Sequence, residues 1–304
     1  MTIDRRLAFG PLLICGFCAW GQSQVQGEIL LNILPRHSLV RVGNSPNIVT
    51  EEARKLAANL WAGAASNDLS RLRRAASDYK SVERVEKIGG DYGALRWLAE
   101  MLLLKPDEQK KRIDNPLTEE FFTFFSTNRC ACLREYIQLK YGVGDRLQQM
   151  DPQYANERCS FLEDLVMFGN PVRNEWESSD ELVKYVPVQK GDTVLDIGCS
   201  FGYYSYRFAK MTGLGGRVYA IDINEPAINF VKTMARNHAL DNILPVVSKT
   251  DNIVVDTPSD VAFICSLYHV IYTWSPEKIQ VAFLQSIKRA LRPGGYLVIA
   301  DNTF

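Results

Sequence analysis

The fold is decided by residues 194–203, which read Val194-Leu195-Asp196-Ile197-Gly198-Cys199-Ser200-Phe201-Gly202-Tyr203. A short apolar run leads into a glycine-rich turn, and a helical pattern begins directly after the turn. This is the order of a buried strand, a tight turn and a helix in an open α/β sheet. Glycines allow the sharp turn and let a ligand approach the backbone closely. Because ligands of such sheets bind beyond the carboxyl ends of the strands, the turn is a predicted ligand site.

Strand and helix patterns alternate from this point to the end of the chain. The sequence predicts strands over residues 193–197, 217–221, 243–247, 261–266 and 296–300, with helices over 203–211, 226–238 and 276–291. Regular alternation implies parallel strands with crossover helices on both faces of the sheet. We therefore predict an α/β domain over residues 165–304, with a Rossmann-like, doubly wound and mainly parallel sheet.

Residues 24–164 predict a mostly helical N-terminal region. Thr50 is a suitable N-cap, and apolar residues then recur at helical spacing up to Trp61. Further helices are expected over residues 68–88, 92–104, 118–126 and 133–141. Gly89-Gly90, Lys105-Pro106 and Asn115-Pro116 read as the breaks between them.

The first 23 residues have the layout of a secretory signal peptide. Arg5 and Arg6 precede an uncharged apolar run over residues 7–20, and small residues follow at Gly21 and Ser23. This predicts a periplasmic or secreted protein. A buried N-terminal helix or an anchor is the alternative for this segment, and the cytoplasm is the alternative location. A membrane-spanning helix needs about 20 apolar residues, so no stable membrane span is expected.

The composition of the chain limits the classes of partner that it is expected to bind. Lys plus Arg and Asp plus Glu both number 35, so no global field attracts nucleic acid, and a small-molecule substrate is expected instead. The oligomeric state stays open. Cys130, Cys132 and Cys159 are too few and too irregularly spaced for a metal site, and none is predicted. They read as free thiols, with a disulfide from Cys159 to one of the pair as the alternative.

Three segments together resemble class I S-adenosylmethionine-dependent methyltransferases. Residues 196–202 resemble motif I, residues 218–222 resemble motif II, and residues 291–299 resemble the helix-to-strand signature before the fifth strand. Upstream, residues 170–183 resemble the lead-in of a bacterial subgroup, many of whose members carry export signals. Two features depart from the family. Ser200 replaces the usual middle glycine of motif I. The chain also stops after the fifth strand, where the family normally adds a helix and two strands. This implies either a truncated chain or a smaller sheet with an exposed edge.

The resemblance implies S-adenosylmethionine as cofactor. It implies that Asp222 holds the ribose, that Ile223 packs on adenine, and that Thr250 and Asp251 meet the adenine amino edge. The full set of implied cofactor residues is Asp196, Gly198, Cys199, Ser200, Gly202, Tyr203, Asp222, Ile223, Thr250, Asp251, Cys265 and Ser266. For Asp196, a structural role in capping the turn is an equal alternative.

His269 is the candidate catalytic residue, because it follows the fourth strand, where a base could reach the methyl donor. The predicted function is methyl transfer to an unidentified acceptor, with a small molecule favoured. The alternative is a non-catalytic exported binding protein that keeps the fold. A nicotinamide oxidoreductase is disfavoured, because Ser205 stands where the dinucleotide fingerprint needs its third glycine.

Overall fold

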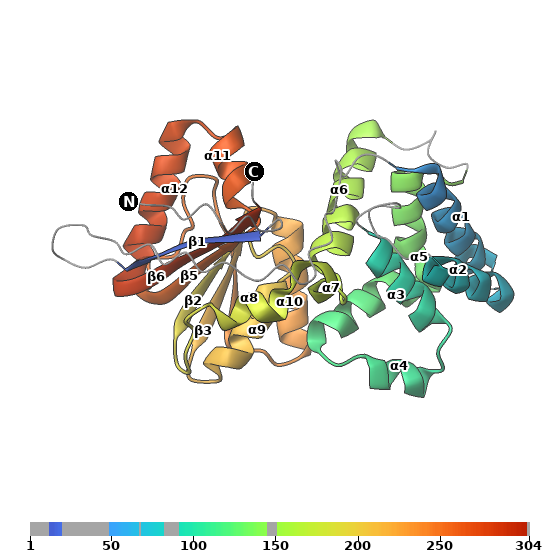
Figure 1. The fold of residues 1–304 in the computed structure, drawn as a ribbon, viewed down its shortest axis with the longest axis horizontal. Coiled ribbons are helices and arrows are strands. Elements are labelled where there is room, and N and C mark those ends of the chain that lie inside the picture. Colours follow the sequence, from blue (N-terminus) through green and yellow to red (C-terminus); the bar gives the residue numbers. More distant parts are fainter. Residues whose placement is uncertain (1–11, 20–48, 67, 82–90, 145–150, 303–304) are drawn as a thin grey trace, which may run out of the picture. The chain divides into compact units, whose positions relative to one another are not determined.

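The chain folds into two compact units in the computed structural model, which describes residues 12–19, 49–66, 68–81, 91–144 and 151–302 (Figure 1). One unit comprises Val40–Glu175, and the other comprises Met1–Leu39 with Trp176–Phe304. The predicted boundary between residues 164 and 165 falls inside helix α6 (Pro152–Phe168), so the division lies later in the chain. Of the predicted signal peptide, residues 1–11 and 20–23 lie outside the described residues.

The second unit contains a six-stranded sheet of order β1-β6-β5-β2-β3-β4. All neighbours from β6 to β4 pair in parallel, which confirms the predicted Rossmann-like fold. The parallel strands are β2 (Thr193–Ile197), β3 (Arg217–Asp222), β4 (Ile243–Val247), β5 (Ser259–Cys265) and β6 (Leu291–Asn302).

The edge of the sheet differs from the prediction. Strand β1 (Leu12–Ala19) pairs antiparallel with β6, so the expectation that the fifth parallel strand forms an exposed edge is wrong. Strand β6 also begins earlier than residue 296. Ser259 pairs with Leu291, Val261 pairs with Tyr296, and the intervening residues 292–295 bulge out of the ladder. The predicted turn at these residues is therefore an irregularity within one strand.

Helices cover both faces of the parallel strands, as predicted. Ala262 and Ile264 belong to a core cluster with Phe283 and Ile287 of α12 (Glu277–Ala290). Phe263 lies between them in sequence and contacts Tyr204 and Phe208 of α9 (Tyr203–Thr212), with ring centroids 4.9 and 5.0 Å away. Successive side chains of a strand point to opposite faces, so α12 and α9 lie on opposite sides of the sheet. The remaining helices of this unit are α8 (Ser179–Lys184), α10 (Glu225–Asn237) and α11 (Tyr268–Trp274).

The other unit is helical over its described residues. Its helices are α1 (Glu51–Ser66), α2 (Leu69–Ser81), α3 (Tyr92–Leu102), α4 (Pro106–Arg112), α5 (Pro116–Tyr141) and α6, and α7 (Asn174–Glu177) follows. Helices α4 and α6 were not predicted. Pro106 was read as part of a break, whereas it begins α4, and Pro152 begins α6 in the same way. A proline has no N–H to lose at the first helical position.

Two predictions for the helical unit are confirmed in detail. The expected gap between residues 126 and 133 is real, because α5 is interrupted by left-handed backbone at Asn128, Arg129 and Cys130. Cys130, Cys132 and Cys159 are free thiols, so the disulfide alternative is wrong. None of the helices in the described part of the chain is long and apolar enough to cross a membrane.

Candidate functional site

The turn after β2 is fixed by two neighbouring strands. The N–H groups of Gly198 and Cys199 both donate to the Ile221 carbonyl of β3, at 2.8 and 3.0 Å. Gly198 has φ +75°, and a Cβ added to it would lie only 2.5 Å from Leu267 Cδ2. Only glycine fits this backbone and this space. The turn is thus hydrogen-bonded to β3 on one side and packed against Leu267, just after β5, on the other.

Asp222 ends β3 and faces the same turn. Its Oδ2 accepts the Ser200 N–H at 2.8 Å, and its Oδ1 accepts the Asn224 N–H at 2.9 Å. A carboxylate has about four acceptor positions, so each oxygen keeps one for a ligand. Two adjacent acceptors of this kind match the two hydroxyls of a ribose. Asn224 in turn caps α10 by accepting the Ala227 N–H, which fixes the chain beyond Asp222.

The side chains of Asp196, Tyr203 and Cys199 are held or buried within the protein. Ser205 Oγ donates to Asp196 Oδ2 at 2.6 Å, which ties β2 to α9 and agrees with the structural role considered for this acid. The Tyr203 hydroxyl lies 2.7 Å from Ser179 Oγ and accepts from Arg207 Nη2 at 2.8 Å. Burial raises the pKa of the Cys199 thiol well above its usual value. Cys199 therefore stays protonated, and its backbone is the part that shapes the turn.

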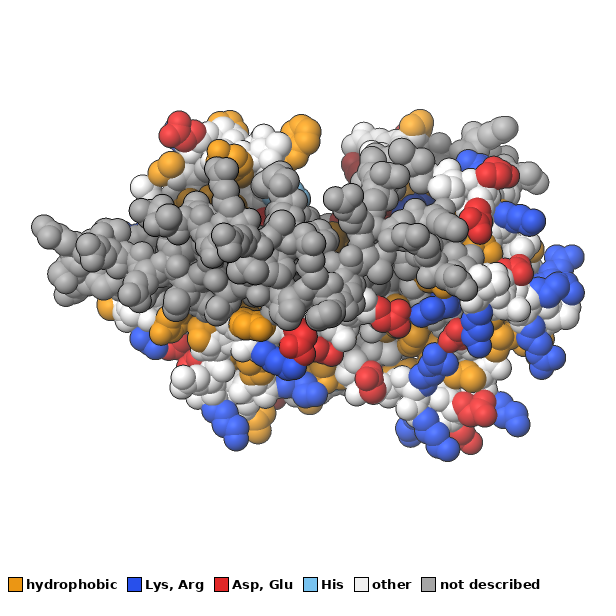
Figure 2. Space-filling view, in the orientation of Figure 1, with side chains coloured by type: hydrophobic (Ala, Val, Ile, Leu, Met, Phe, Trp, Pro, Cys, Tyr) orange, Lys and Arg blue, Asp and Glu red, His pale blue; other side chains and the backbone are white. Residues whose placement is uncertain are grey.

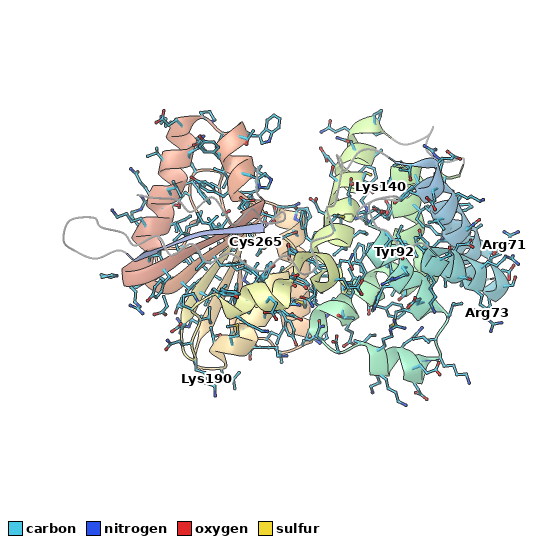
Figure 3. The ribbon with its side chains drawn as sticks, viewed as in Figure 1. Arg71, Arg73, Tyr92, Lys140, Lys190 and Cys265 are labelled. Atoms are coloured by element: carbon cyan, nitrogen blue, oxygen red, sulfur yellow. The ribbon has the colours of Figure 1, made fainter. Side chains whose placement is uncertain are left out.

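Glu177 is a site residue that the sequence prediction missed. It is 8% exposed, and its Oε2 accepts the Tyr204 hydroxyl at 2.6 Å. Its Oε1 lies 4.0 Å from Cys265 Sγ, at the carboxyl end of β5, where Figure 3 labels Cys265. Glu177 lies within the lead-in segment that resembles the methyltransferase subgroup. That resemblance was the available signal, but no pattern in the sequence joins the segment to β5.

The other predicted cofactor residues differ in whether they contact the strand ends around the glycine turn. Ser266 has φ +52° and donates its N–H to Ala300 of β6 at 2.8 Å, so it belongs to the same edge of the sheet. Ile223 follows Asp222 and is 59% exposed, which leaves its side chain open to a flat ring. Thr250 and Asp251 lie in the turn after β4. Among the described residues, no side-chain hydrogen bond links that turn to the glycine turn.

His269 is held by one carboxylate at two points. Its backbone N–H donates to Asp301 Oδ2 at 2.7 Å, and its ring Nδ1 lies 2.5 Å from Asp301 Oδ1. His269 is the second residue of α11, just after β5, and Asp301 is near the end of the neighbouring strand β6. Sequence reasoning named His269 as a candidate from its position and did not name Asp301. Among the residues that the structure describes, no cluster of His, Cys, Asp and Glu is arranged to hold a metal ion.

Comparison with known protein families assigns residues 188–303 to a methyltransferase domain. The chain is 43% identical over 58 residues to a "Probable cobalt-precorrin-6B C(15)-methyltransferase (decarboxylating)" of Saccharolobus solfataricus, covering 19% of this chain and 29% of that protein. It is 30% identical over 139 residues to a tRNA U34 carboxymethyltransferase of Pseudoalteromonas translucida, covering 43% and 39% of the two chains.

A solved structure gives a further match. A SAM-dependent methyltransferase from Aquifex aeolicus shares 30% sequence identity, covers 43% of this chain and 66% of its own, and superposes with a TM-score of 0.39. The chain therefore spans less than two thirds of each of these relatives.

Proposed function

Because residues 188–303 match the family model of a methyltransferase domain, we propose that the whole protein transfers a methyl group from S-adenosylmethionine to a small-molecule acceptor. The cofactor of this domain class is S-adenosylmethionine, and the site described above suits a nucleoside. The protein's activity and its acceptor are the parts that need an experiment.

Asp222 is the observation that carries the proposal. Its two oxygens each hold one backbone N–H and keep one acceptor position each, beside a glycine turn that leaves no room for a side chain at Gly198. We propose that Asp222 holds the ribose and that the backbone of residues 198–202 lies against the rest of the nucleoside. A ribose-binding acid next to a bare backbone turn is what a nucleoside cofactor requires.

The cofactor supplies a methyl group already activated by its positively charged sulfur. The residues of the chain then have to bind, orient and exclude water, because in-line methyl transfer depends mainly on positioning. We propose that Glu177 and Cys265, whose side chains lie 4.0 Å apart at the end of β5, border the methyl donor. His269 is the candidate that takes a proton from the acceptor.

A small-molecule acceptor fits the charge of the chain. The formal net charge is zero, and on the face drawn in Figure 2 Lys and Arg side chains are interspersed with Asp and Glu. Nucleic-acid binding needs several Lys or Arg gathered on one surface. By their names, two of the similar proteins act on tRNA and on cobalt-precorrin-6B. Cobalt-precorrin-6B is a small molecule, which is the class of acceptor that we propose here.

The test is calorimetric titration of the full chain with S-adenosylhomocysteine and, as control, NAD⁺. We expect saturable binding of S-adenosylhomocysteine with micromolar affinity and no binding of NAD⁺. Binding of NAD⁺ alone would favour an oxidoreductase. Failure to bind either compound, by a chain with native circular dichroism, would refute the proposed function.

A further inference from the structure

Helix α5 contains a left-handed turn that no helix-breaking residue explains. Asn128, Arg129 and Cys130 have φ of +50°, +56° and +57°. Between Pro116 at its start and Tyr141 at its end, α5 has no glycine and no further proline. Each left-handed residue with a side chain is disfavoured by a factor of about 5 to 30, so three in succession are disfavoured by about 100-fold or more. The turn is therefore stabilised by contacts elsewhere in the helical unit.

Helix α3 contacts both halves of α5. The Trp97 ring of α3 packs edge-on against Phe121 of the first half, with ring centroids 6.0 Å apart. Asp91, the N-cap residue of α3, accepts the Tyr136 hydroxyl of the second half at 2.5 Å and also accepts the Tyr141 hydroxyl. A continuous α5 would point its second half in a different direction, so α3 could not keep both sets of contacts. The two hydrogen bonds to Asp91 are therefore a latch that keeps α5 bent.

A second unfavourable feature lies beside this latch. The Tyr79 hydroxyl is buried and has no hydrogen-bond partner among the residues that the structure describes. Tyr79 lines the same small cavity as Asp91 and Tyr141. A buried hydroxyl without a partner destabilises the state that buries it. Opening of the latch would let this hydroxyl reach water and would also release the left-handed turn, so two unfavourable features of the bent state would disappear together.

We propose that residues 127–130 are the hinge of a two-state switch in the helical unit. In the bent state the latch is closed and residues 128–130 are left-handed. In the second state the latch is open and α5 is one continuous right-handed helix. Helix α6 moves with the second half, because Lys140 Nζ binds Glu163 at 2.7 Å.

The two contributions that oppose each other in this switch are similar in size. A hydrogen bond to a charged group favours its state by a factor of about 10 to 150, so the two bonds of the latch together contribute about 100-fold or more. The strain of the left-handed turn acts in the opposite direction with the same order of magnitude. A ligand that binds one state more tightly would therefore shift the population towards that state.

The first experiment tests whether the turn is strained, by scanning calorimetry of the full chain. Glycine adopts left-handed backbone as readily as right-handed, so Asn128→Gly and Arg129→Gly should each raise the unfolding temperature of the helical unit by about 2 °C or more. Both side chains are exposed, so little packing is lost. Thr123→Gly is the control, because Thr123 is also exposed but lies in the right-handed first half of α5, and it should lower that temperature. A fall for all three variants would overturn the proposal.

The second experiment measures the distance between two spin labels, at Thr123 and Gln138, by pulsed electron paramagnetic resonance. The labels are attached through a ketone-bearing amino acid, so the native cysteines stay unmodified. In a continuous helix the two Cα atoms lie about 22 Å apart, and the left-handed turn gives a different distance. We expect one main distance in the unmodified chain. Asp91→Ala should raise the population at the continuous-helix distance at least about tenfold, and Tyr136→Phe, which removes one bond of the latch, should raise it less.

Two controls separate a switch from general loss of structure. Asp107→Ala, on the exposed side of α4, should leave the distances unchanged. Adding Asn128→Gly to Asp91→Ala should reverse the change, because glycine favours the left-handed turn and destabilises a continuous helix.

Two outcomes of the distance measurement would overturn the proposal. An unchanged distance in folded Asp91→Ala and Tyr136→Phe proteins would show that the bend is static. A broad range of distances with loss of helical circular dichroism in both variants would show that the latch holds the fold itself rather than one of two folded states.

Discussion

Asp222 at the end of β3 accepts the backbone N–H of Ser200, 2.8 Å away in the turn after β2. One carboxylate therefore shapes the glycine turn and borders the space beyond it. The pairing explains why the turn and the acid occur together although 22 positions separate them in sequence. It also makes Asp222 the most informative position to change.

Asp222→Ala should weaken S-adenosylhomocysteine binding by at least about 30-fold. The variant loses two acceptors for the ribose and releases the Ser200 N–H, and a hydrogen bond to a charged group contributes about 1.5–3 kcal/mol. Calorimetric titration of the full chain measures the change. Asp256→Ala is the matched control, because Asp256 is exposed in the loop before β5. Unchanged affinity in a folded Asp222→Ala protein would remove the ribose role from this acid.

Ser200→Gly should stabilise the protein by about 0.5 kcal/mol. Ser200 has φ +48°, a left-handed conformation that costs a side-chain-bearing residue about 1–2 kcal/mol, partly offset by the larger chain entropy of glycine. Thermal unfolding gives the difference. Ser275→Gly is the control, since Ser275 has φ −103° and should lose stability on the same change. A lower melting temperature for Ser200→Gly would mean that the hydroxyl itself stabilises the turn.

Asp91→Ala should destabilise the helical unit by about 3–5 kcal/mol. Asp91 is 1% exposed and accepts hydrogen bonds from the hydroxyls of Tyr136, at 2.5 Å, and Tyr141. Lys140 Nζ lies 4.0 Å from the same carboxylate, and Figure 3 shows Lys140 among these helices. Removing the acid leaves the two tyrosine hydroxyls buried without this acceptor. Lys140 also loses one neighbouring carboxylate.

Hydrogen–deuterium exchange is the suitable measurement, because it reports the two units separately. Exchange in α3 and α5 is expected to be faster in Asp91→Ala than in the unmodified protein. Exchange in the parallel sheet is expected to stay unchanged. Asp107→Ala on the exposed side of α4 should leave exchange unchanged. An Asp91→Ala protein with native exchange rates would show that the cluster contributes no net stability.

The same cluster predicts alkaline sensitivity of the helical unit. Burial, and then the negative charge of Asp91, raise the pKa of Tyr136 and Tyr141 well above the usual value for tyrosine. Below about pH 10 both hydroxyls are protonated in the folded and unfolded chains alike. Above it the unfolded chain releases protons that the folded chain retains, so the free energy of unfolding falls as pH rises. Urea titrations between about pH 8 and 11 should show this fall, and Tyr136→Phe should reduce its slope.

The parts of the fold that follow from local pattern were predictable. Each parallel strand begins or ends within a few residues of its predicted bounds, because continuous apolar runs such as residues 261–264 suit only a sheet buried on both faces. Pro106 was read as a break and the helix that begins at Pro152 was not predicted, since a proline alone does not say whether it ends one helix or begins the next. Asp151 before Pro152 was the missed clue, because it caps α6 through the Tyr154 N–H.

Site residues could be predicted only where they lie at the end of a strand or in the turn directly after it. Gly198 and Asp222 follow directly from the strand ends. Glu177 and Asp301 did not follow, because they meet Cys265 and His269 across 88 and 32 residues of chain. Such contacts depend on strand order and on the path of the lead-in segment, and no periodicity in the sequence encodes these.

Deleting residues 1–23 should make the protein self-associate. The deletion removes β1, whose residues from Leu12 to Ala19 pair with β6 from Asn302 to Tyr296. The unpaired N–H and C=O groups of β6 would then form an open edge that can pair with another chain. Light scattering after gel filtration should show dimers or larger species. Ile14→Pro is the matched variant, because it breaks the same pairing without shortening the chain. Cleavage of the proposed signal peptide near Gly21 would also remove β1, so an exported mature chain should associate in the same way. A monomeric truncated chain with unchanged thermal stability would show that β1 does not protect β6.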